Sequence, residues 1–162
     1  MVLDRIGDEA IPVLAPMLSS QNATNRAFAT WIIGNRGTNV APFTRRFQAQ
    51  LSDPSPVARA AAAEALLKLN SDPRPVIAAL LQSFHEGDQT TRSYVLRTFG
   101  SATNWAQIAV PVLLDLLNAA TNTYDRVDIH NAIWKLDRST AEKVFTNLLP
   151  RVPAKAKQVS ED

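Results

Sequence analysis

A periodic arrangement of arginines restricts the fold of this chain more than any other sequence feature. Four arginines follow one another at spacings of 33, 33 and 34 residues: Arg26, Arg59, Arg92 and Arg126. Two columns of apolar residues keep a spacing of 33 throughout: Leu14, Phe47, Leu80, Leu113 and Leu18, Leu51, Phe84, Leu117. Three columns that coincide over four copies predict an internal repeat, whose units bury their apolar faces by stacking against one another.

Each copy contains two predicted helices joined by a polar turn. The first helices are expected at residues 11–19, 43–51, 76–84 and 108–117, and the second helices at 25–33, 57–69, 91–99 and 126–136. Two second-helix columns are apolar in every copy and are expected in the core: Ala29, Ala62, Val95, Ile129 and Ile33, Leu66, Phe99, Ile133. No segment sustains an alternation of apolar and polar residues, so we predict no strands. The predicted fold class is all-α, a right-handed α-solenoid (an α-α superhelix) of helix pairs with a period of about 33 residues.

The second copy carries the pattern most completely. Asp53 opens a proline-containing turn, and the alanine-rich helix that follows contains Arg59. The spacing Asp53-x5-Arg59-x2-Ala62-x2-Ala65-Leu66 resembles the HEAT-repeat consensus, in the short form found in bilin-lyase-like HEAT proteins. The resemblance covers about residues 3–150. Ankyrin and tetratricopeptide repeats have a similar period, but their signatures occur in no copy.

The resemblance implies a ladder of ion pairs and hydrogen bonds between repeats, formed by the acid of the turn and the arginine of the second helix. Two copies hold both residues: Asp53 with Arg59, and Glu86 with Arg92. Ser20 and Ala120 replace the acid in the copies of Arg26 and Arg126. The implied ladder is therefore half complete.

The repeats predict a single HEAT-like domain over residues 1–152, made of a partial unit, four helix pairs and a terminal helix at 140–149. Leu3-Asp4-Arg5 matches Leu136-Asp137-Arg138, where a second helix ends, so the chain is expected to begin at the tail of a repeat cut from a longer protein. A short N-terminal cap segment is the alternative. Residues 153–162 are mostly polar and are predicted to form a flexible tail.

Composition and residue types exclude several kinds of site. The chain has no cysteine, which excludes disulfides, thiolate catalysis and cysteine-ligated zinc. His85 and His130 are too few for a histidine zinc site, and Asp125 and Asp128 are interpreted as acids at a solvated helix start. We therefore predict no enzyme activity, no catalytic residues, no metal and no cofactor. No apolar run approaches the roughly 18 residues of a membrane span, so we expect a soluble protein, cytoplasmic by default.

The second helices are expected to form the concave side of the solenoid, which is the usual binding surface of helical repeats. Positions two, five and nine after each repeat arginine share one helix face. These columns supply nine candidate binding residues: Phe28, Trp31, Glu64, Lys68, Tyr94, Arg97, Asp128, Asn131 and Lys135. Aromatic and basic side chains of this kind anchor protein partners. We therefore predict a scaffold module that binds a protein or peptide, with further repeats or domains of a longer chain as other candidate partners.

Nucleic acid is the second candidate partner, because aromatic rings stack on bases and cations bind phosphates. Against it, the formal net charge is only +2, and Glu64 interrupts the positive field. HEAT-like DNA glycosylases use a concave Trp and Asp, whose only counterparts here are Trp31 and Asp128, three repeats apart. A bilin-lyase activity rests on the resemblance alone.

The aromatic residues also have a purely structural interpretation. Phe28 and Trp31 would then cover an exposed edge of the core. Trp105 and Trp134 are expected to pack between helices.

Overall fold

Two layers of helices make up the part of the chain that the structure describes. A computed structural model describes residues 10–148, without the side chains of residues 37–39 and 145–148. The predicted N-terminal partial unit and the predicted tail lie outside the described residues. Between residues 10 and 148 the chain forms helices and turns and no strand, as predicted. None of these helices is both long and apolar enough to cross a membrane.

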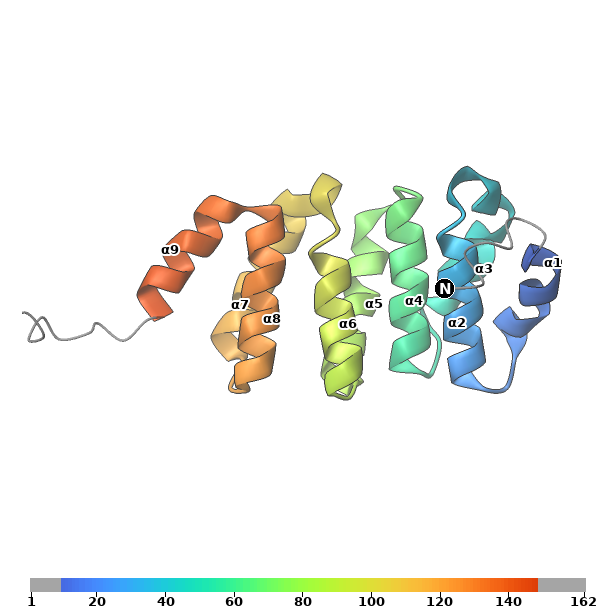
Figure 1. The fold of residues 1–162 in the computed structure, drawn as a ribbon, viewed down its shortest axis with the longest axis horizontal. Helices are drawn as coiled ribbons and strands as arrows, with labels where there is room; N and C mark the ends of the chain where they lie inside the picture. Colours follow the sequence, from blue (N-terminus) through green and yellow to red (C-terminus); the bar gives the residue numbers. More distant parts are fainter. Residues whose placement is uncertain (1–9, 149–162) are drawn as a thin grey trace, which may run out of the picture.

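The second helix of each pair lies in one layer (Figure 1). The second helices are α2 (Ala23–Gly34), α4 (Pro56–Lys68), α6 (Gln89–Phe99) and α8 (Thr123–Leu136). The first helices are α1 (Ile11–Leu14) with its 3₁₀ continuation η3 (Ala15–Ser19), α3 (Thr44–Gln50), α5 (Pro73–Glu86) and α7 (Ala106–Ala119), and α9 (Arg138–Leu148) follows. Of these, α3, α5 and α7 lie behind the layer of second helices, and α1 lies beside α2 at the end of the row (Figure 1). Because α2 contacts α4, α4 contacts α6 and α6 contacts α8, these four helices form one continuous surface, the second-helix face.

Short polar side chains and proline mark where the helices begin. Four Asx side chains each accept a hydrogen bond from a backbone N–H in the first turn of the next helix: Asn22, Asp72, Asp88 and Asn122. Pro56 lies in the first turn of α4, where its missing N–H leaves no bond unmade. Asn70 follows α4 with φ of 51°, a left-handed conformation that ends helices.

The first helix of the first repeat is less regular than predicted. Residues 11–19 divide into α1 and the 3₁₀ segment η3 instead of forming one α-helix. Pro16 lies at the start of η3 and lacks the N–H that would continue α-helical bonding. In the second repeat, Pro42 lies in a 3₁₀ segment, η4 (Gly37–Phe43), and α3 follows from Thr44, one residue after the predicted start. A third such segment, η5 (Thr103–Trp105), leads into α7.

The predicted core columns are confirmed. Both second-helix columns are fully buried: Ala29, Ala62, Val95, Ile129 and Ile33, Leu66, Phe99, Ile133. The first-helix column is buried against them in one apolar cluster: Leu14, Phe47, Leu80 and Leu113. Each buried side chain of leucine size stabilises the fold by about 1.5–3 kcal/mol relative to exposure, so the repeats are held together mainly by this cluster.

The arginine ladder joins each repeat to the next one. Arg26 donates from Nε and Nη2 to the two carboxylate oxygens of Asp53, at 2.7 Å each. Arg59 pairs with Glu86 of the following repeat through Nη2 alone, and its buried Nε has no hydrogen-bond partner among residues 10–148. The prediction that Arg26 lacks an acid is therefore wrong, because the acid comes from the next repeat. Ser20 contributes its backbone carbonyl, which accepts a 2.8 Å hydrogen bond from Arg26.

The last two arginines depart from this arrangement. The turn before Arg126 has alanine in place of an acid, and Arg92 binds Asp125 instead, with 3.1 Å between Nε and Oδ2. Asp125 is buried, so its interpretation as a solvated acid is wrong. Arg126 donates to the backbone carbonyls of Leu117 and Ala120. Among residues 10–148, the ladder thus has ion pairs at its first three arginines and backbone hydrogen bonds at the fourth.

Glycine lets α2 and α4 approach closely. A Cβ atom built on Gly34 would lie 2.6 Å from the Cβ of Ala65 and 3.1 Å from its Cα. Gly34 is the last residue of α2, so it ends the helix as the sequence predicts and also forms part of the interface with the next repeat.

The two tryptophans expected between helices differ. Trp105 is buried, as predicted. Trp134 is 41% exposed, and the guanidinium carbon of Arg138 lies 4.8 Å from its ring centroid. Gly100 and Gly34, one and three repeats earlier in the same column, face the following repeat. Because α8 is the last second helix between residues 10 and 148, no such neighbour covers Trp134.

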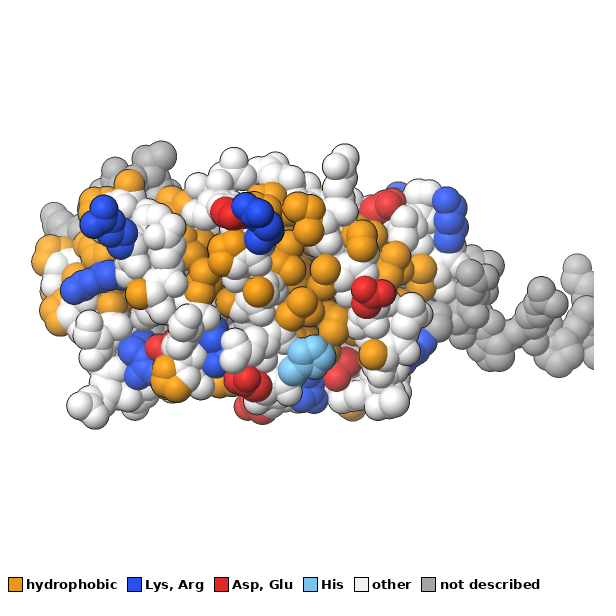
Figure 2. Space-filling view, turned by 180° about the vertical axis from the view of Figure 1, so that it is seen from behind, with side chains coloured by type: hydrophobic (Ala, Val, Ile, Leu, Met, Phe, Trp, Pro, Cys, Tyr) orange, Lys and Arg blue, Asp and Glu red, His pale blue; other side chains and the backbone are white. Residues whose placement is uncertain are grey.

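The first-helix face has a different character. Figure 2 shows hydrophobic side chains across its middle with few charged groups among them. Two exposed large apolar residues on first helices are Val13 on α1 (72%) and Ile108 on α7 (46%). This face supplies positions for control substitutions away from the second-helix face.

Candidate binding surface

Two neighbouring pockets lie on the second-helix face. The aromatic pocket, of about 270 Å³, lies between α2, α4 and α6 and is lined by Thr24, Ala27, Phe28, Trp31, Ala61, Tyr94 and Arg97. The polar pocket, of about 290 Å³, lies between α6 and α8 and is lined by Ser93, Leu96, Arg97, Asp128, Asn131, Ala132 and Lys135. Arg97 lines both pockets, so the two lie next to each other on this face.

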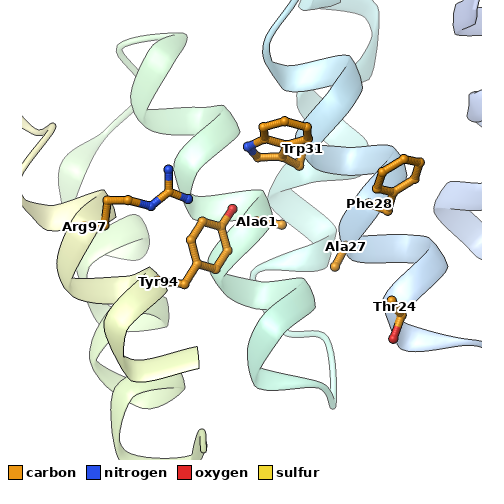
Figure 3. Close-up of a pocket in the computed structure, with 7 residues that line it drawn as sticks. All are labelled: Thr24, Ala27, Phe28, Trp31, Ala61, Tyr94 and Arg97. Atoms are coloured by element: carbon orange, nitrogen blue, oxygen red, sulfur yellow. The ribbon is translucent and has the colours of Figure 1, made fainter. Parts of the chain in front are cut away.

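The aromatic pocket exists because a small residue separates large ones. Phe28 and Trp31 project from α2 one helical turn apart, and Tyr94 projects from α6 on the opposite side (Figure 3). Ala61 of α4 lies between them and is almost completely buried. Ala27 packs with Ala61 in a small apolar cluster beneath the rings. The walls are therefore aromatic and the floor is alanine.

A hydrogen-bonded network on α4 and α6 supports the pocket. The Tyr94 hydroxyl donates to Glu64 Oε2 at 2.6 Å, and Lys68 Nζ donates to Glu64 Oε1 at 2.8 Å. Lys68 Nζ also donates, at 2.6 Å, to Oδ1 of Asn35, the residue that follows α2. Burial and the neighbouring Glu64 carboxylate raise the pKa of Tyr94 well above its ordinary value, so the hydroxyl stays protonated as a donor.

This network changes the roles expected for two candidates. Glu64 was predicted to interrupt the positive field of the surface, but it is buried and bound by both Tyr94 and Lys68. Lys68 was predicted as one of the basic candidate binding residues, but its ammonium forms an ion pair with the Glu64 carboxylate. The two charges compensate each other locally, which leaves Arg97 as the charged group of the aromatic pocket.

Arg97 lies at the junction of the two pockets. Its guanidinium carbon is 5.0 Å from the Tyr94 ring centroid, a cation–π arrangement that orients the side chain over the ring. The side chain is exposed, and among residues 10–148 it makes no hydrogen bond or ion pair. Figure 3 shows the indole nitrogen of Trp31 on the side of its ring that faces Arg97 and Tyr94. The pocket thus presents N–H donors next to aromatic walls.

The polar pocket is built by α6 and α8. Ser93 Oγ donates to Asp128 Oδ2 at 2.7 Å across the two helices. Asn131 and Lys135 lie on α8, and both are exposed. Of the predicted candidates, this pocket brings together Arg97, Asp128, Asn131 and Lys135.

The two residues required for a base-excision pocket are not brought together. Trp31 lines the aromatic pocket and Asp128 lines the polar pocket. Their helices, α2 and α8, are separated by α4 and α6 in the layer (Figure 1). Within the described residues, no group of three His, Asp or Glu side chains is placed to hold a metal ion.

Sequence reasoning missed the small residues of the site. Ala27 and Ala61 line the aromatic pocket but were not among the candidates. A signal was present, because Ala61 occupies the column of Phe28 and Tyr94. A small residue between two aromatic ones in adjacent repeats predicts a recess at that position.

Comparison with known proteins agrees with this architecture. A family model described as HEAT repeats matches residues 11–97. No curated protein and no solved structure matches the chain significantly. The matched region covers more than half of the 162 residues and includes α1 to α6 up to Arg97. The paired helices, the buried repeat columns and this match show that the chain belongs to the HEAT-repeat family.

Proposed function

We propose that this chain is a non-enzymatic scaffold module that binds a protein or peptide through the second-helix face. We further infer that residues 1–152 form one domain, a right-handed solenoid with a period of about 33 residues, whose concave side is the second-helix face. The observation that carries the binding proposal is the aromatic pocket, in which Phe28, Trp31 and Tyr94 surround an alanine floor.

The pocket has the composition of an anchor site. Partly buried aromatic side chains provide large apolar contact area with little loss of conformational freedom, and Trp, Tyr and Arg dominate binding energy at protein interfaces. Phe28 and Trp31 also pack against the core, which holds their rings in place before any partner binds. A preformed recess of this kind lowers the entropic cost of binding.

Nucleic acid is the weaker second candidate. Aromatic rings beside Arg97 could stack on a base and bind a phosphate. However, Lys68 is bound to Glu64, and Asp128 adds a negative charge to the polar pocket. Backbone recognition of a strand needs cations along successive phosphates, and this surface offers few that are not already paired.

A peptide-display selection tests the proposal. The native chain is expected to enrich a family of short linear peptides from a random library, and Trp31→Ala is expected to lose that enrichment because it removes one wall of the pocket. Ile108→Ala is the matched control, since it shortens an exposed apolar side chain on the first-helix face. Equal enrichment by the native chain and Trp31→Ala would refute the assignment of the site, provided that circular dichroism shows both to be folded.

A further inference from the structure

The aromatic pocket combines apolar walls with unmatched hydrogen-bond donors. Among residues 10–148, neither the Arg97 guanidinium nor the Trp31 indole N–H has a hydrogen-bond acceptor. The Glu64 carboxylate is occupied by Tyr94 and Lys68. The Asp128 carboxylate lines the neighbouring polar pocket, where it accepts from Ser93. A group that accepts hydrogen bonds and carries negative charge therefore complements the pocket best.

We propose that the occupant of this pocket is a peptide segment with an acidic residue close to a large apolar one. The proposal rests on the binding function proposed above and specifies its ligand. The apolar side chain lies between Phe28, Trp31 and Tyr94, over Ala61. The carboxylate of the neighbouring acidic residue accepts hydrogen bonds from the guanidinium of Arg97.

The position of Arg97 suits it to bind the carboxylate of the peptide. Its position over the Tyr94 ring restricts the guanidinium without using its N–H groups, because the cation–π contact involves the ring face and not a hydrogen-bond acceptor. A planar guanidinium binds a carboxylate through two parallel hydrogen bonds. An ion pair formed beside apolar walls is also less weakened by water than one on an open surface.

The fixed charges favour an acidic peptide over a basic one. Glu64 is neutralised by Lys68, so a basic side chain that enters the aromatic pocket would meet Arg97 without a free acid to balance it. In the polar pocket, Lys135 is exposed and has no ion pair among the described residues, whereas Asp128 accepts from Ser93. The cations that line the two pockets, Arg97 and Lys135, are thus both available to acids of a bound segment.

The test uses peptides enriched by the native chain in the display selection described above. Each peptide is synthesised with its acidic residue intact and with that residue replaced by the corresponding amide, and its affinity for the native chain and for Arg97→Gln is measured by fluorescence anisotropy. The amide peptide is expected to bind the native chain about tenfold more weakly than the acid peptide. Arg97→Gln is expected to weaken the acid peptide to a similar extent and to leave the amide peptide nearly unchanged.

Arg45→Gln is the matched control. It removes an exposed guanidinium from α3, on the first-helix side, and is expected to change neither affinity. Trp31→Phe is a second variant that keeps an aromatic wall while removing the indole N–H, and it is expected to weaken the acid peptide more than the amide peptide.

The outcomes separate this proposal from the broader one. Enriched peptides that lack acidic residues, or acidic peptides whose affinity does not depend on Arg97, would overturn the ligand assignment and leave peptide binding intact. A failure of the native chain to enrich any peptide over Trp31→Ala would overturn both proposals. Salt-sensitive binding of a random single-stranded DNA pool that competes with the peptides would assign the pocket to nucleic acid instead.

Discussion

The hydroxyl of Tyr94 on α6 donates a 2.6 Å hydrogen bond to the buried carboxylate of Glu64 on α4, across 30 positions of sequence. This bond fixes the ring that forms one wall of the aromatic pocket. It also occupies the acid that would otherwise face Arg97. The charge of the site therefore depends on a contact between two repeats.

Tyr94→Phe tests the strength of this bond. The substitution keeps the ring but leaves one oxygen of the buried Glu64 carboxylate without its donor, so we expect the free energy of unfolding to fall by about 2 kcal/mol. Urea denaturation measures the change. Tyr124→Phe is the control, because Tyr124 is 74% exposed, and it should leave stability nearly unchanged. Equal stabilities for both variants would show that the bond contributes nothing net.

The same tyrosine predicts a loss of stability at alkaline pH. The pKa of Tyr94 is raised in the folded chain above its ordinary value of 10.0, so the folded state keeps a proton that the unfolded state releases. The stabilisation that protonated Tyr94 gives the folded state is present in full below pH 10 and decreases as the pH rises above 10. The stability difference between the native chain and Tyr94→Phe should therefore be smaller at about pH 11 than at about pH 8. A difference that stays constant over this range would contradict the raised pKa.

Asp53 predicts the opposite dependence at acidic pH. Burial raises the pKa of Asp53, but hydrogen bonds from Arg26 and from the Ser55 N–H outweigh this effect, so the pKa lies below its ordinary value of 3.8. The stabilisation is present above that value and is lost as the pH falls below it through the folded-state pKa. We expect Asp53→Asn to cost about 3 kcal/mol at neutral pH and progressively less in acid.

Denaturation curves of the native chain and Asp53→Asn over a series of pH values check this prediction. Asp72→Asn is the control, since Asp72 pairs with Arg74 on the surface and asparagine retains its helix-capping oxygen. It should change stability little at any pH. A stability difference between the native chain and Asp53→Asn that is as large in strong acid as at neutral pH would contradict the lowered pKa of Asp53.

Gly34→Ala tests the close approach of α2 and α4. The new methyl group would lie 2.6 Å from the Cβ of Ala65, so the helices must separate, and overpacking of this kind costs about 1–3 kcal/mol. Helix propensity alone predicts a gain of at most about 1 kcal/mol, the value for a helix interior, because Gly34 is the last residue of α2. We expect a net loss, measured by urea denaturation. Gly100→Ala should cost less, because its nearest neighbours lie at 3.2 Å and one of them is the flexible Lys135 side chain.

Thr30→Val tests a buried polar contact between the first two repeats. The Thr30 hydroxyl donates to Gln50 Oε1 at 2.7 Å, and Gln50 Nε2 donates to the Leu18 carbonyl at 3.3 Å. Valine fills the same space but leaves the buried amide oxygen without a donor, so we expect a loss of about 1–2 kcal/mol. Thr30→Ser retains the hydroxyl and is expected to recover part of the loss. An unchanged free energy of unfolding for Thr30→Val would show that this hydrogen bond makes no net contribution to stability.

The ladder illustrates the limit of prediction from the repeat pattern. Alignment of the four repeats places Asp53 and Arg59 in the same repeat, which suggests that they pair with each other. In the folded chain Asp53 instead receives the side chain of Arg26, 27 residues earlier, and Arg59 bonds to the backbone carbonyl of Asp53. The residue types of a ladder are visible in the sequence, but its partners depend on the offset between stacked repeats.

The candidate site was predictable in part for a similar reason. Helical spacing alone places Phe28, Trp31, Tyr94 and Arg97 on one face, and the structure brings these four around one pocket. Spacing does not determine which charges on that face are free. Glu64 and Lys68 are on the expected face, yet they bind each other and Tyr94.

The sequence by itself determined the helix pairs and the buried columns of this HEAT-repeat chain, and it did so because burial of apolar surface is non-directional. A side chain such as Leu66 or Phe99 is buried whenever its face of the helix meets a neighbour, whatever the details of the contact. Only the tertiary structure decided the partners of Arg26 and Glu64 and which side chains line the recess over Ala61. Hydrogen bonds and pockets depend on distances between side chains of different repeats, and a change of about 1 Å in helix stacking is enough to make or break them.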